Sequence, residues 1–109
     1  MNTTDTSPAP RIIVAAFDAG QRMPSREDLV TLDEQLRDEL ARLAGLARGA
    51  ALTVPARSRA WYALTAAIDA AEDADRLVMG NGPLTAALHV AELARRALGL
   101  RDALEVTQQ

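Results

Sequence analysis

A chain of 109 residues without cysteine can bury the core of one domain, but it cannot form a disulfide or a thiolate metal site. Its net charge of −3 argues against general nucleic-acid binding, which depends on neutralising phosphates. No apolar stretch is long enough to cross a bilayer, and the N-terminus lacks the basic start of a signal peptide. We therefore expect a cytoplasmic protein that binds neither membrane nor nucleic acid.

The composition favours packed helices over sheets. Alanine, the best helix former, occupies 23 positions, whereas aromatic residues make up only 3% of the chain. All 12 basic residues are arginine. Alanine and arginine both have GC-rich codons, so this bias indicates a high-GC genome such as that of an actinobacterium.

The first apolar run, RIIVAAFDAGQ, follows a ten-residue segment that we expect to be a flexible tail. Such a run could open a nucleotide-binding sheet, but the chain offers no second strand to pair with it. The same residues fit a short helix at 11–20, with Ile13 and Phe17 on one face and Gly20 at its end. Irregular structure is the alternative.

The safest prediction is a helix at 26–48. Ser25 is a suitable N-cap, and Gly49 is expected to end the helix. Acid-before-base pairs four residues apart, such as Asp33 with Arg37, should stabilise its outer face. The apolar residues recur at helical spacing: Leu29, Leu32, Leu36, Leu40, Leu43 and Ala47.

A second helix is predicted at 56–79, because Pro55 suits a helix start and the residues at 80–83, Gly-Asn-Gly-Pro, end one. Tyr62 should point away from its buried side, towards the surface or an interface. The expected buried residues are Trp61, Leu64, Ile68, Ala71 and Val78, with Ala60, Ala67 and Ala74 beside them.

The third helix is predicted at 84–98, and continuation past Gly99 to about 105 is equally compatible with the pattern. Its core stripe is expected to be Leu84, Leu88, Ala91, Ala94 and Leu98. A second apolar arc lies beside this stripe, so the helix must touch two neighbours or a partner molecule. The candidate interface residues are Tyr62, Val90, Leu93, Ala97, Leu100 and Leu104.

These elements predict an all-α fold, an antiparallel three-helix bundle with a short additional N-terminal helix. The domain should span 11–105, between a tail at 1–10 and another at 106–109.

Few polar residues suggest chemistry. His89 is the only histidine and is expected on the solvent side, where too few ligands accompany it for a metal site. Asp75 falls at the edge of the predicted core, where it either reaches water or pairs with His89 in a contact sensitive to pH. Asp69, Glu72 and Asp73 extend an acidic cluster that reads as a solvated face or as a surface for a cation or a basic partner. No catalytic, cofactor or metal residue is predicted.

Several segments resemble a known family. Met-Pro-Ser at 23–25 leads into REDLVTLDEQLRDELARL, then Val-Pro, WYALTAAIDAAEDA, Gly-Pro-Leu and AELARRALGL. This pattern is similar to a family of small actinobacterial proteins, mainly from Streptomyces, defined only as a domain of unknown function. The resemblance spans about 12–105 and implies an all-α fold without naming catalytic residues.

LDEQLRDELARL also looks like the first helix of the all-helical chorismate mutases, which hold a dicarboxylate with arginines and a lysine. Arg37, Arg48 and Arg57 are the available arginines, but this chain has no lysine.

The sequence favours a non-enzymatic protein–protein interaction module, regulatory in character, that binds a partner protein or forms a homodimer. The alternative is a small helical enzyme or binder that recognises an acidic metabolite through arginines.

Overall fold

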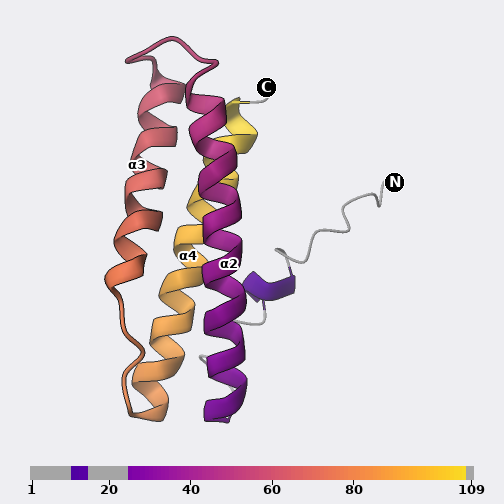
Figure 1. Cartoon of the computed structure of the whole chain (residues 1–109), viewed down its shortest axis with the longest axis vertical. Coiled ribbons are helices and arrows are strands. Elements are labelled where there is room, and N and C mark those ends of the chain that lie inside the picture. The colour runs from indigo at the N-terminus through magenta and orange to yellow at the C-terminus, as the bar shows by residue number, and fades with distance from the viewer. Residues whose placement is uncertain (1–10, 15–24, 108–109) are drawn as a thin grey trace.

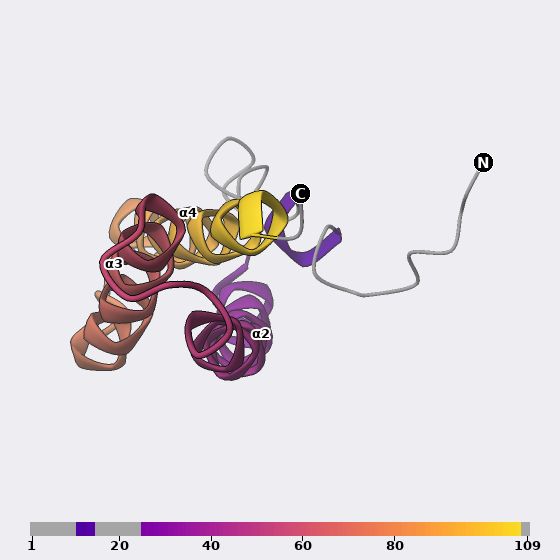
Figure 2. The same cartoon turned by 90° about the horizontal axis from the view of Figure 1, so that it is seen from above.

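The computed structural model describes residues 11–14 and 25–107. They form an all-α bundle of three long helices that run up, down and up: α2 (Arg26–Ala51), α3 (Arg59–Asp73) and α4 (Pro83–Thr107). α3 is antiparallel to its neighbours (Figure 1), and the view from above shows the three helices packed in a triangle (Figure 2). No strand occurs among the described residues. The all-α prediction is therefore confirmed.

Helix α2 begins as its sequence predicts. The Ser25 Oγ accepts a hydrogen bond from the Asp28 backbone N–H at 3.1 Å, and two acidic residues occupy the first turn, where the helix dipole favours them. Gly49 does not end the helix, which continues to Ala51. A glycine inside a helix costs only about 1 kcal/mol. The buried face is the predicted stripe without Leu32, which is only partly buried, and with Glu39 and Ala44 added: Leu29, Leu36, Glu39, Leu40, Leu43, Ala44 and Ala47.

Helix α3 is shorter than predicted at both ends. It starts at Arg59, where the Ser58 Oγ accepts from the Trp61 N–H at 3.2 Å, and it tightens into the 3₁₀ turn η1 (Ala74–Arg76). Leu77 is already extended, with ψ 135°. Consequently Val78, predicted to be buried, is 85% exposed. Trp61 is half-buried, with its ring edge-on to that of Tyr62.

Helix α4 continues through Gly99 to Thr107, beyond the expected end of the domain at 105. Its orientation differs from the prediction, because the three leucines of the expected core stripe face outwards, whereas its two alanines, Ala91 and Ala94, are buried as expected. Leu84 and Leu88 are each 57% exposed, and Leu98 is 40% exposed. The arc expected to meet a partner forms the core instead, with Ala86, Val90, Leu93, Ala97 and Leu100 fully buried.

Residues 11–14 form a helical turn that lies beside α2 (Figure 1). Ile13 is buried in the core cluster, and Ile12 is partly buried against it. This part of the predicted N-terminal helix is confirmed, whereas Phe17 and Gly20 lie outside the described residues. None of the described helices is long and apolar enough to cross a membrane.

Gly80, in the connection before α4, is expected to disfavour a side chain. A Cβ there would lie 2.4 Å from Thr85 Cγ2 and 3.0 Å from Thr85 Cβ, whereas at Gly82 the nearest atom would be 3.5 Å away. We predict that Gly80→Ala lowers the free energy of unfolding by about 1–3 kcal/mol, the usual cost of overpacking. Denaturant unfolding with Gly82→Ala as control tests this. Equal stability of the two variants would refute the steric argument.

Candidate functional site

A partly buried polar cluster, with His89 as its buried member, joins all three helices. The Arg37 Nε–H donates to both carboxylate oxygens of Asp33, at 3.1 and 3.2 Å. His89 of α4 donates from Nε2 to Asp33 Oδ1 at 2.6 Å, and the side chains of His89 and Asp33 are only 6% and 17% exposed. The Arg37 guanidinium also donates to the carbonyls of Ala74 (3.2 Å) and Leu77 (2.6 Å). Arg37 therefore holds the end of α3 against α2, and His89 connects α4 to the same cluster.

This cluster corrects two predictions. His89 is buried rather than solvated, and its partner is Asp33 rather than Asp75. Asp75 lies in η1 and is exposed. A histidine–carboxylate pair can orient a catalytic base, but a nucleophile must then adjoin the ring. Ser25 and Ser58 are helix caps instead, so the cluster fits a structural role in holding the helices together.

A second cluster fixes the other side of the same helix end. Arg96 of α4 donates to the Ala70 carbonyl at 2.8 Å and to the Asp73 carboxylate at 3.1 Å, and its Nε–H donates to Glu92 at 2.9 Å. Burial opposes the charge of Arg96, but the hydrogen bonds with Glu92 and Asp73 outweigh it and raise the guanidinium pKa. Hydrogen bonds from Arg96, then from Arg95, lower the pKa of Glu92. Cations at the C-terminal end of α3 also complement its dipole.

The lowered pKa of Glu92 predicts a small, pH-dependent contribution to stability. The contribution is complete above the ordinary carboxyl pKa of 4.5 and is lost as the pH falls through the lower pKa of the folded state. Because the Glu92 side chain is 40% exposed, we expect Glu92→Gln to cost less than about 1 kcal/mol at pH 7. Urea unfolding should show this difference shrinking towards pH 3. A difference that grows in acid would contradict the prediction.

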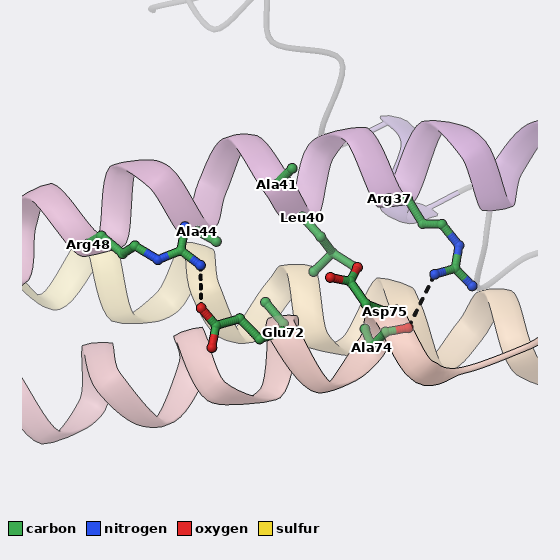
Figure 3. A pocket seen from close by; sticks show the side chains of 9 residues that line it. Arg37, Leu40, Ala41, Ala44, Arg48, Glu72, Ala74 and Asp75 are labelled. Atoms are coloured by element: carbon green, nitrogen blue, oxygen red, sulfur yellow. Dashed lines mark hydrogen bonds and ion pairs between the residues drawn. The ribbon is translucent and has the colours of Figure 1, made fainter.

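The residues suspected of holding an acidic metabolite only partly converge. Arg37 and Arg48 of α2 lie towards opposite ends of a hollow of about 150 Å³ between α2 and α3, floored by Leu40, Ala44 and neighbouring alanines (Figure 3). Arg48 is ion-paired with Glu72 across this hollow, and Arg37 holds the cluster described above. Arg57 does not line it. That residue lies in the α2–α3 connection, with a positive φ of 68°.

Two of the four residues in the predicted acidic cluster, Glu72 and Asp73, pair with arginines. Glu72 pairs with Arg48, and Asp73 pairs with Arg96 and, at 3.8 Å, with Arg76. Within the described part of the chain, no group of three or more potential ligands could hold a metal ion.

The predicted interface residues are mostly internal. Val90, Leu93, Ala97 and Leu100 are fully buried in the core, and Leu104 is partly buried against it. Only Tyr62 is exposed, at 55%. The expectation that these α4 residues would meet a partner is therefore wrong for this fold, because they contact α2 and α3.

The sequence-based interpretation missed the opposite side of α4. At about 100° per residue, one sector roughly 80° wide points away from the bundle. Its aliphatic residues Leu84, Leu88 and Leu98 are exposed, and so is Val106, at 57%. We define the outer α4 face as Leu84, Leu88, Arg95, Leu98, Asp102 and Val106. Ala91 falls in the same sector but is buried.

The comparisons with known proteins identify a family but no activity. A family model described as "Family of unknown function (DUF6415)" matches residues 11–109. No curated protein and no solved structure matches the chain.

Proposed function

We propose that the chain, which belongs to this family of unknown function, is a non-enzymatic helical protein–protein interaction module that acts as a homodimer. The outer α4 face is its contact surface. The observation that carries the proposal is the exposure of four aliphatic side chains in one sector of a single helix, by 40% to 57%. A contiguous exposed apolar patch on a protein surface commonly marks a site of protein interaction.

The length of α4 makes self-association feasible. Its 25 residues extend for about 37 Å. Stable dimers commonly bury about 800 Å² per partner, and a helix pair of this length, with its flanks, can approach that area. The apolar residues on both sides of α4 support the same proposal, since only one side is covered within the bundle.

The direct test is the solution mass of the full chain by light scattering, for the wild type and for Leu88→Glu. We expect a wild-type dimer and a folded Leu88→Glu monomer, because a carboxylate in the apolar contact would be desolvated. Leu46→Glu is the matched control. Leu46 is 52% exposed on α2, away from the outer α4 face, so this variant should remain dimeric. A monomeric wild type at about 100 µM, or equal loss of the dimer in both variants, would overturn the proposal.

The competing proposal is a binder of an acidic metabolite, favoured by the two arginines that line one hollow. Succinate at millimolar concentration should then raise the melting temperature of the wild type by several degrees, as binding to the folded state requires. Arg48→Gln should abolish the shift, because Arg48 bonds the side chain of Glu72, whereas Arg37 already holds two backbone carbonyls. A shift that survives in Arg48→Gln would exclude this hollow.

The alanine and arginine bias supports an actinobacterial source as part of the same proposal. We also propose that the protein is located in the cytoplasm, where it would bind its protein partner. Fractionation of cells expressing the tagged protein would test the location.

A further inference from the structure

The outer α4 face has the spacing of a coiled-coil seam. Its positions 84, 88, 95, 98 and 102, together with the buried Ala91 in the same sector, are separated by four, three, four, three and four residues. This alternation places every member on one line when two helices wind around each other. Three positions hold leucine and one holds alanine, whereas Arg95 and Asp102 are charged and exposed. These two charges bear on the orientation of a partner helix.

A parallel pair is disfavoured by this seam. In a parallel, two-fold symmetric pair each seam residue faces its own copy, so Arg95 would face Arg95 and Asp102 would face Asp102. Like charges directly opposed across a helix interface are destabilising. An antiparallel pair avoids both oppositions.

We propose that two copies pair antiparallel along the outer α4 face, with Leu88 of each copy against Leu98 of the other. This inference rests on the proposed function, and it specifies the partner as a second copy in one register. Counting along the helix from that contact, Ala91 faces Arg95 of the second copy, and Leu84 faces Asp102. Every position of the seam from 84 to 102 then has an opposite member.

The charges are complementary in this register. In this register Arg95, which bonds Glu92 of its own chain at 2.9 Å, also faces the turn of the second copy that carries Glu92, so that opposite charges approach each other. Asp102 lies opposite the first turn of α4 in the second copy, where unpaired backbone N–H groups favour a carboxylate. Shifting the register by one heptad in either direction removes every leucine–leucine contact: one shift sets Leu88 against Glu105, and the other leaves Leu98 without an opposite residue in α4.

Disulfide trapping tests the orientation, because the natural chain has no cysteine. Full-length Leu88→Cys and Leu98→Cys proteins, one of them carrying a tag that changes its mass, are oxidised separately and as a mixture. In the antiparallel register, two copies of either cysteine are about 15 Å apart along the helix, beyond disulfide reach, whereas the mixture brings unlike cysteines together. We therefore expect roughly tenfold more trapped dimer in the mixture than in either protein alone. Leu46→Cys mixed with Leu88→Cys is the control and should trap little.

The outcomes separate this inference from the proposed function. Efficient trapping of each variant alone would indicate a parallel pair, overturning the register while leaving the dimer intact. A wild-type dimer by light scattering without trapping in the mixture would overturn pairing through this face. A wild-type monomer would overturn the proposed function and this inference together.

Discussion

A protein carrying both Leu93→Glu and Leu100→Glu is expected to be unfolded, rather than to become a folded monomer. Both leucines are fully buried in the core between the three helices. Each substitution places a carboxylate where it has no partner, at a cost of several kcal/mol. The sum reaches the roughly 5–15 kcal/mol by which domains of this size are stable. Circular dichroism should show loss of the cooperative thermal transition.

The matched control makes the same chemical changes on the same helix. Leu88→Glu with Leu98→Glu alters two leucines of the outer α4 face, which already contact solvent. We expect the control to keep a cooperative transition, with a free energy of unfolding within about 1 kcal/mol of the wild-type monomer. If the Leu93 and Leu100 variant melted like this control, the assignment of the two faces of α4 would be wrong.

The orientation of α4 shows where sequence reasoning was insufficient. Both sides of this helix are rich in leucine and alanine, so periodicity establishes the helix but not the side that faces the core. One signal was available. Extending the Leu84–Leu98 stripe by helical steps brings Arg95 and Asp102 into it, whereas the arc from Ala86 to Leu104 remains apolar. Charges tolerated on a stripe indicate its solvent side.

Local chemistry explains why other features were predictable. The N-cap at Ser25 and the buried stripe of α2 depend on residues three or four positions apart. Such short spacings can be read directly from the sequence. The end of α3 does not depend on such local spacing. Its last turn is set by Arg37 from α2 and Arg96 from α4, which bind carbonyls at 70, 74 and 77. Bonds between distant segments cannot be read from the local pattern.

Only part of the Asp33–Arg37–His89 cluster could be predicted from the sequence, for the same reason. The spacing of Asp33 and Arg37 identified their ion pair, which the structure confirms. Its position was misjudged, because the pair was assigned to the outer face. His89 lies 56 residues from Asp33, so only the packing of α4 on α2 brings them together.

Asp33→Ala is accordingly expected to be among the most destabilising polar substitutions in this protein. It removes the acceptor shared by Arg37 and His89, of which His89 is buried and Arg37 half-buried. Breaking a buried pair by deleting one partner typically costs about 3–5 kcal/mol, and some remaining exposure of Asp33 and Arg37 reduces this to roughly 2–4 kcal/mol. Urea unfolding at pH 7 provides the measurement. Glu34→Ala, an exposed acid at the next position of α2, should change stability by less than about 0.5 kcal/mol.

A double-mutant cycle distinguishes stabilisation through the Asp33–His89 contact from the independent effects of the two substitutions on stability. If Asp33 and His89 stabilise the fold through each other, Asp33→Ala with His89→Ala should cost less than the sum of the single variants, by roughly 1–3 kcal/mol. Additive effects would mean that the 2.6 Å contact adds no net stability. The pair would then serve to fix how α4 packs on α2, since a buried carboxylate accepts only the arrangement that supplies its donors.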